Sequence, residues 1–194
     1  MESRHRDHEL VISLQGGDLN ALGVLFDRHQ TMVYRTALAI VGDTDAAADI
    51  LQEAFLRLHR FAQRVDPARP LEPWLYRVTA NLSYTWVKPR GRWLSRLGDL
   101  AEYLAGETRE TPDDLAESEC SWREIQKAVV SLPLAQRIVV VPHYLNDQSV
   151  EQIAEILSIP EGTVKSRLYY GRKELRRRLG LERELVAGAW YEVT

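Results

Sequence analysis

Residues 146–179 read NDQSVEQIAEILSIPEGTVKSRLYYGRKELRRRL and contain two short helical patterns separated by only two residues. In the first pattern, apolar side chains recur at helical spacing, and Ser149 with Gln152 has the form of a capping box. In the second, Pro160 suits a first helical position and apolar side chains again recur at helical spacing. Two helices joined so tightly predict a helix-turn-helix, whose second helix places its first residues in the major groove of DNA.

The second of these helices is strongly basic. Residues 160–180 carry seven Lys and Arg side chains against two Glu, in a chain whose net charge is −3. Phosphate contacts supply most of the affinity for DNA, and Lys, Arg, Ser and Thr near a helix start reach phosphates or base edges. A basic helix end also complements the helix dipole in proteins that bind no DNA, but the tight two-helix spacing favours DNA binding. We predict six DNA-binding residues here: Glu161, Thr163, Lys165, Ser166, Arg167 and Arg172.

The same stretch resembles the carboxy-terminal promoter-binding domain of the extracytoplasmic-function (ECF) sigma factors, the small two-domain specificity subunits of bacterial RNA polymerase. The resemblance lies in SVEQIAEILSIPE followed by GTVKSRLYYGRKELRRRL. It implies a protein that gives RNA polymerase its choice of promoter, and it needs support from the rest of the chain.

Length and composition limit the remaining possibilities. The chain has 194 residues, 45% of them hydrophobic, which suffices for one good core or two small ones. Cys120 is the only cysteine and the histidines are scattered, so we expect no disulfide, metal or other cofactor. The charged start lacks an apolar core and the aliphatic run 138–141 stops at Pro142, so we expect no signal peptide, no membrane insertion and a cytoplasmic location. His5 and His8 lie in this start, which we expect to be frayed rather than to bind metal.

Residues 18–41 and 43–62 each keep a helical apolar period. One face of the second helix is polar except for Leu56. A large aliphatic group among carboxylates is typical of a docking surface, although single exposed leucines are common. The segment DAAADILQEAFLRLHRF also resembles the helix with which the family binds the polymerase. By that resemblance, four residues contact core RNA polymerase: Asp49, Gln52, Glu53 and Leu56.

Residues 63–73 contain three prolines and predict a stiff loop, and residues 74–88 predict a helix. The side of this helix opposite its apolar stripe carries four side chains: Arg77, Asn81, Tyr84 and Lys88. Cations hold phosphates, an amide can read a base edge and a Tyr ring can stack, so this face suits single-stranded DNA. An ordinary polar exterior is the alternative interpretation.

The segment PWLYRVTANLSYTWVKPRGR resembles the family's promoter-melting segment, which usually reads W-L-Y-R-I-A-x-N followed by a basic tail. This chain departs from that pattern at Thr85, where an acidic residue is usual, and Pro89 and Gly91 interrupt its basic tail. The resemblance implies that the four residues above, together with Arg90 and Arg92, contact the downstream promoter element as duplex and as melted strand.

An acidic stretch divides the chain. Residues 96–121 carry two basic and eight acidic side chains and no long apolar stripe. We therefore predict an all-α protein of two small helical domains joined by an acidic linker. The sigma region 2-like domain spans residues 1–92, the linker 93–117 and the region 4-like helix-turn-helix domain 118–180. Residues 181–194 form an extension whose role the sequence does not indicate.

These observations predict a sigma factor that binds core RNA polymerase and directs promoter recognition and opening. The family resemblance also implies an anti-sigma factor as partner. We expect no enzymatic activity, because no nucleophile–base pair, phosphate-binding glycine loop or metal cluster is visible in the sequence. A stand-alone helix-turn-helix regulator with a sensing or dimerising first domain is the main alternative, but it would need neither the DILQEAF block nor the WLYR helix. An adaptor without DNA contact is a third, which the basic helix disfavours.

Overall fold

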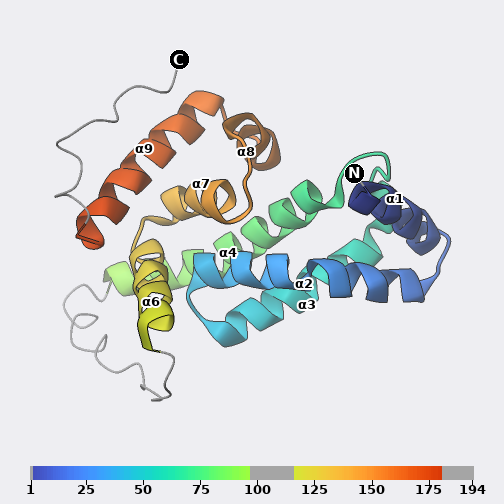
Figure 1. Cartoon of the computed structure of the whole chain (residues 1–194), viewed down its shortest axis with the longest axis horizontal. Coiled ribbons are helices and arrows are strands. Elements are labelled where there is room, and N and C mark those ends of the chain that lie inside the picture. The colour runs from blue at the N-terminus through green and yellow to red at the C-terminus, as the bar shows by residue number, and fades with distance from the viewer. Residues whose placement is uncertain (1, 97–115, 181–194) are drawn as a thin grey trace.

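A computed structural model describes residues 2–96 and 116–180, with side chains described for 7–88 and 122–180, and every regular element within these ranges is a helix (Figure 1). This confirms the all-α class predicted from the sequence. The elements are α1 (Glu2–Gln15), α2 (Leu19–Val41), α3 (Thr44–Arg60), the 3₁₀ turn η1 (Ala62–Arg64), α4 (Leu71–Arg96), α6 (Ala116–Val130), α7 (Leu134–Leu145), α8 (Val150–Leu157) and α9 (Glu161–Arg178).

The amino-terminal bundle consists of α1 to α4 packed around a main apolar core, with a second apolar cluster near the carboxy-terminal end of α2. Leu25, Val33 and Leu58 are fully buried in this core, where Phe26 and Phe55 meet edge to face with ring centroids 4.9 Å apart. Because core side chains from several helices pack closely together, they determine how α3 and α4 lie on α2. The same packing determines which faces of α3 and α4 remain exposed.

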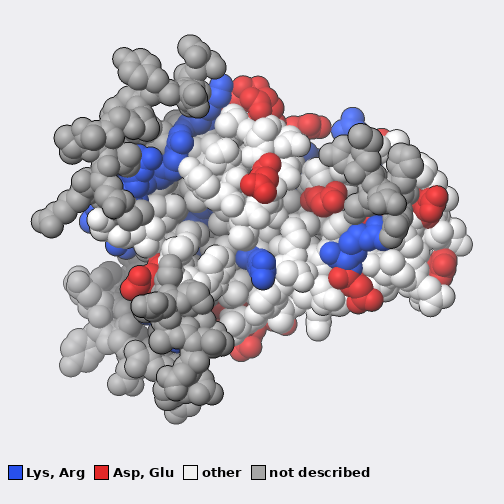
Figure 2. All heavy atoms as spheres, viewed as in Figure 1, with Lys and Arg blue, Asp and Glu red and all other residues white. Residues whose placement is uncertain are grey.

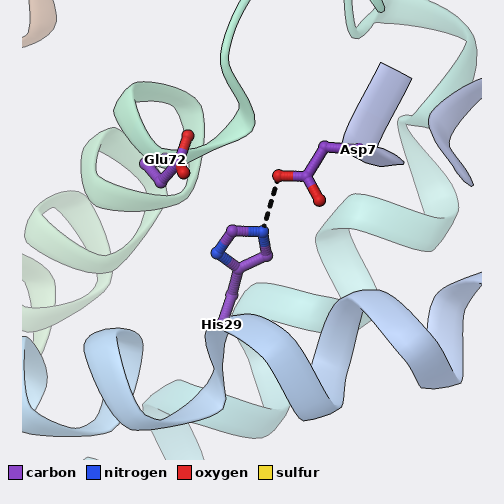
Figure 3. Close-up of side chains that lie close together, drawn as sticks. All are labelled: Asp7, His29 and Glu72. Atoms are coloured by element: carbon purple, nitrogen blue, oxygen red, sulfur yellow. Dashed lines mark hydrogen bonds and ion pairs between the residues drawn. The ribbon is translucent and has the colours of Figure 1, made fainter. Parts of the chain in front are cut away.

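The charged start of the chain is helical, so the prediction of a frayed terminus was wrong. In α1, the buried carboxylate of Asp7 accepts a hydrogen bond from Arg28 and lies 2.9 Å from His29 Nε2 (Figure 3). Both partners belong to α2. Low apolar content suggested fraying, but these polar contacts with α2 hold the helix in place.

α4 extends beyond the predicted range at both ends. It begins at Leu71, with Pro73 in its first turn, where a missing N–H removes no helical hydrogen bond. It also continues past Pro89 to Arg96, where the sequence suggested an interruption. The proline-rich loop is correspondingly shorter and runs from residue 65 to 70.

The carboxy-terminal bundle consists of α6 to α9 around Leu132, Val139, Ile153 and Val164. This second core is small, as expected for a short domain. It holds α9 against α7 and α8, so the basic side chains of α9 lie on the side away from the core.

The two bundles pack against each other, which the sequence did not predict. α4 lies along α7 and α8, while the carboxy-terminal part of α2 contacts α6 and α7 (Figure 1). Gly42 adopts a left-handed conformation at the end of α2, with φ of 75°, and a Cβ there would lie 2.8 Å from Val130 Cγ2. Glycine therefore permits both the sharp turn and the close approach of α6.

Candidate nucleic-acid interface

α8 and α9 form the helix-turn-helix expected from the sequence. The capping box at the start of α8 is present, with the backbone N–H of Ser149 donating to Gln152 Oε1 over 2.8 Å. Ser158 ends α8 in a left-handed conformation, φ 53°, and Pro160 is the N-cap of α9. The local signals in the sequence therefore predicted this turn, except that Pro160 is the N-cap of α9 and not, as expected, its first helical residue.

The predicted DNA-binding residues of α9 lie on its solvent side. Glu161, Lys165 and Ser166 are exposed, whereas Thr163, Arg167 and Arg172 are half-buried. Lys165 Nζ lies 3.5 Å from a Glu161 carboxylate oxygen, a distance typical of a weak surface ion pair that DNA phosphate can replace. Figure 2 shows Lys and Arg side chains gathered along α9 at the upper left of the molecule.

Glu174 neutralises part of the basic end of α9. Its carboxylate accepts hydrogen bonds from Arg177 at 2.6 Å and from Arg178 at 2.7 Å. These bonds lower the pKa of Glu174 to about 2. The Glu-x-x-Arg-Arg spacing that allows this pairing is visible in the sequence. The sequence analysis nevertheless did not predict that Glu174 would pair with two of the three arginines at the end of α9.

Gly171 sets the distance between α9 and α7. A Cβ at this position would lie 2.7 Å from Val140 Cγ2, so only glycine allows the two helices to approach as they do. A glycine in the interior of a predicted helix is the sequence signal that could have indicated this close crossing.

A second row of predicted DNA-binding residues lies on α4. Asn81, Tyr84 and Lys88 are exposed, and Lys88 Nζ lies 5.5 Å from the centroid of the Tyr84 ring. This cation–π contact places an ammonium group and an aromatic face side by side, the two groups that bind a phosphate and a base of a single strand. Arg90 and Arg92 belong to α4, but their side chains lie outside those that the structure describes.

Arg77, predicted to share that row, contacts the other bundle instead. Its Nε donates to the backbone carbonyl of Ile156 at 2.6 Å and its Nη2 to that of Glu155 at 2.7 Å. Beside it lies an open cavity of about 480 Å³ between the proline-rich loop and α8, whose lining includes Arg64 and Trp74. Nothing in the sequence indicated this position of Arg77 between the bundles.

The residues predicted to bind core polymerase share one face of α3. Asp49, Gln52 and Leu56 are exposed, and Leu56 has 54% of its surface accessible. Glu53 is half-buried and its carboxylate pairs with Arg57 at 2.8 Å. The opposite face of α3 is buried in the core, so the helical projection placed these side chains correctly.

Asp7, His29 and Glu72, from α1, α2 and α4, come close enough to consider as a metal site, with ligand atoms within 4.8 Å of one another (Figure 3). However, one oxygen of Asp7 already bonds Arg28 and the other bonds His29. A cation here would have to displace a guanidinium group. The cluster is best described as a polar network that joins α1 to α2.

Two family models match the two parts of the chain. Sigma-70 region 2 matches residues 25–92, and Sigma-70, region 4 matches residues 122–175. The ECF RNA polymerase sigma factor SigW of Bacillus subtilis (strain 168) is 30% identical over 184 residues, covering 87% of this chain and 94% of SigW. The chain belongs to the ECF family of RNA polymerase sigma factors. It is therefore a transcription initiation factor, and the family predicted from the sequence is confirmed.

Further comparisons support the same family and fold. SigL, an ECF sigma factor of Mycobacterium tuberculosis (strain ATCC 25618 / H37Rv), is 33% identical over 153 residues, 78% of this chain and 85% of SigL. Among solved structures, CnrH in complex with the cytosolic domain of CnrY has a TM-score of 0.63 at 21% identity, covering 91% of this chain and 99% of CnrH. RpoE in complex with the anti-sigma factor NepR, from Bartonella quintana, has a TM-score of 0.64 at 20% identity, covering 87% and 98%. These two structures support the fold. No helix in the described residues has the length and apolar character needed to span a membrane.

Proposed function

We propose that this sigma factor binds promoter DNA through two surfaces and core RNA polymerase through a third. The first turns of α9 would contact the upstream promoter element, the exposed side of α4 the downstream element, and α3 the polymerase. The observation that carries this proposal is the position of the predicted residues whose side chains the structure describes: apart from Arg77, which contacts α8, they lie on helix faces turned away from a packed core.

On α9, the side chains in reach of DNA belong to the opening turns. Val164 and Leu168 anchor the helix in the core, so Lys165 and Ser166 lie on the solvent side. A helix held in this way enters the major groove with its amino-terminal end first. Lys165 and Arg167 would contact phosphates or base edges there.

On α4, the chemistry suits a melted strand rather than a duplex. The amide of Asn81 can pair with the edge of an unpaired base, and the ring of Tyr84 can stack on one. Lys88, held over that ring, would bind the adjoining phosphate. Single-strand binding at this face would favour the open form of the promoter.

On α3, Leu56 is the apolar centre of an otherwise polar face formed with Asp49 and Gln52. Interfaces commonly combine one buried aliphatic anchor with a polar rim, and this face has that composition. We assign it to core RNA polymerase.

We further propose that this protein has no catalytic activity of its own, acts in the cytoplasm beside the polymerase, and is controlled by an anti-sigma factor. The fold shared with RpoE, which was solved bound to the anti-sigma factor NepR, supports the last point. The domain limits would be 1–92 and 118–180, with the acidic linker 93–117 between them, although α4 continues to Arg96 and α6 already begins at Ala116.

A reconstitution with purified core RNA polymerase tests the proposal. The full chain should bind the core enzyme and direct initiation from a subset of a bacterial promoter library. A chain that bound duplex DNA by itself but did not bind core polymerase would instead support a stand-alone regulator.

A further inference from the structure

An apolar groove lies on the surface where α2, α6 and α7 meet. Its volume is about 170 Å³, and its lining includes Leu38 of α2, Val129 of α6 and Val140 of α7. An apolar cavity of about 150 Å³ is large enough to hold a benzene molecule. The groove therefore has room for one aromatic side chain. None of the described residues that line it belongs to the predicted DNA-binding or polymerase-binding sets.

Large apolar side chains remain exposed around this groove. Trp122 and Ile125 of α6 and Tyr144 of α7 all line it, and all three are exposed to solvent. A single exposed apolar side chain is ordinary, whereas several that surround one hollow mark a binding surface. The groove thus has the character of a site for an apolar segment of protein.

A cationic side chain also lines the groove. Arg35 of α2 is exposed there, and it pairs with no acidic side chain in the part of the chain that the structure describes. A carboxylate that approached Arg35 would therefore form a charge-assisted hydrogen bond without displacing another partner. The lining as a whole suits a segment in which an aromatic side chain lies close to an acidic one.

The sequence of residues 181–194 has this composition. These residues lie outside the part of the chain that the structure describes, and they read LERELVAGAWYEVT. Trp190 is followed two positions later by Glu192, and the segment carries three glutamates against one arginine. The match to the region 4 family model ends at residue 175, so the family gives no account of this segment.

α9 brings the start of this segment close to the groove. Val140, which lines the groove, is also the residue against which Gly171 of α9 packs. From Gly171, α9 runs about 12 Å to its C-cap, Leu179. Gly180 then has a φ of 69°, a left-handed conformation that ends the helix and changes the direction of the chain. The residues from Gly180 to Trp190 span up to about 33 Å when extended, so Trp190 can reach the groove.

We propose that residues 181–194 bind this groove in the same molecule. The indole of Trp190 fills the groove, and the carboxylate of Glu192 pairs with Arg35. Aromatic side chains bury a large apolar area and contact other rings favourably. The covalent link favours the chain's own segment over another molecule, because a short tether gives an effective concentration in the millimolar range. The contact is independent of the functions proposed for the DNA-binding and polymerase-binding faces.

Disulfide trapping in the full chain tests this contact directly. In a Cys120→Ser background, Gln126→Cys places a thiol in the groove and Tyr191→Cys places one beside Trp190, while the proposed anchor and ion pair are kept. The matched control combines Tyr191→Cys with Ile12→Cys, because Ile12 is exposed on α1, and α1 lies at the opposite end of the molecule from α6 (Figure 1). Under mild oxidation, the groove pair should form an intramolecular disulfide at least tenfold faster than the control pair.

Two outcomes of this experiment would overturn the proposal. Equal rates for the two pairs, with circular dichroism showing both variants folded, would mean that the segment does not bind the groove. A disulfide between two molecules as the main product would assign the segment to a second copy of the chain. Adding Trp190→Ala should slow the groove pair to the rate of the control pair, and an unchanged rate would refute Trp190 as the anchor.

The ion pair is tested by exchanging its charges in the same groove-pair variant. Arg35→Glu brings like charges together and should slow disulfide formation about threefold, as expected for an exposed ion pair. Adding Glu192→Arg should restore the rate, whereas a structural effect of Arg35→Glu alone would persist. A rate that stayed low in the exchanged variant would refute the pairing of Glu192 with Arg35.

Binding of free indole gives a measurement that needs no engineered thiol. Trp190→Ala leaves the groove without its proposed occupant, so added indole should bind there and shift the NMR signal of the Trp122 indole N–H. The wild-type chain should require at least tenfold more indole for the same shift, because its own Trp190 occupies the groove. Equal titration curves for the two proteins would show that the groove is empty in the wild type and would overturn the proposal.

Discussion

Replacing Leu56 with arginine tests the core-binding face of α3. Leu56 has 54% of its surface exposed, and its neighbours Phe55 and Leu58 supply the contacts to the core. The variant should therefore fold, with a free energy of unfolding within about 0.5 kcal/mol of the wild type. The polymerase interface should respond far more strongly.

The loss has two parts. Burying a whole leucine is worth roughly 1.5–3 kcal/mol, so docking the exposed half yields about 1 kcal/mol. The arginine also carries a charge into a contact that was apolar, and an unpaired buried charge costs about 3 kcal/mol or more. The sum of about 4 kcal/mol predicts a Kd for core RNA polymerase several hundredfold weaker.

The assay is a titration of core RNA polymerase with labelled full-length protein, alongside circular dichroism. Leu19→Arg is the control, because Leu19 is an exposed leucine at the start of α2, outside the proposed face. It should retain wild-type affinity. A folded Leu56→Arg variant with wild-type affinity would refute the docking face, and an unfolded one would refute the assignment of Leu56 to the surface.

Further predictions concern α9 and α4, the two helices proposed to bind DNA, and the polar contacts of Asp7 and Glu174. Alanine at both Lys165 and Arg167 should abolish upstream footprints, reduce the salt slope of DNA binding by about two, and leave core binding intact; full upstream protection would contradict it. Asn81→Ala should reduce permanganate reactivity of the melted strand without affecting upstream protection. If the variant and the wild type were equally reactive, Asn81 would not contact the melted strand. Asp7→Ala should lower the free energy of unfolding by about 3 kcal/mol, measured by urea denaturation, because it leaves a half-buried guanidinium and a buried imidazole without their partner; a change below about 1 kcal/mol would show that α1 is held otherwise. The arginine bonds that lower the pKa of Glu174 stabilise α9 fully above the ordinary pKa of 4.5, and this contribution is lost as the pH falls toward about 2. Far-UV circular dichroism should therefore show a helix loss across that interval which Glu174→Gln lacks.

The elements that the sequence predicted well are those defined by neighbouring residues. The capping box at Ser149 and the two-residue gap before Pro160 are local signals, and the structure has both features. The exposure of Leu56 followed from the 3.6-residue period of α3 alone. In each case the information lies within one or two helical turns.

The features that the sequence did not predict depend on residues far apart in the chain. The hydroxyl of Tyr76 donates to the carbonyl of Ile138, 62 residues away, and nothing near Tyr76 indicates that Pro142 leaves this carbonyl without its helical donor. In the same way, the charged start forms a helix because Asp7 meets Arg28 on α2. Pairings of this kind arise from tertiary packing, which single-sequence patterns do not encode.

The absence of a side chain at Gly171 affects how α9 would be oriented on DNA. α9 rises about 1.5 Å per residue, so Lys165 lies about 9 Å along the helix from the point where Gly171 touches Val140. A methyl group at this crossing would push α9 away from α7 and tilt its leading end about that pivot. Successive base pairs are separated by only about 3.4 Å, so a small tilt changes which base pair Lys165 faces. The orientation of the helix that we propose to bind the upstream element thus depends on Gly171, which packs against α7.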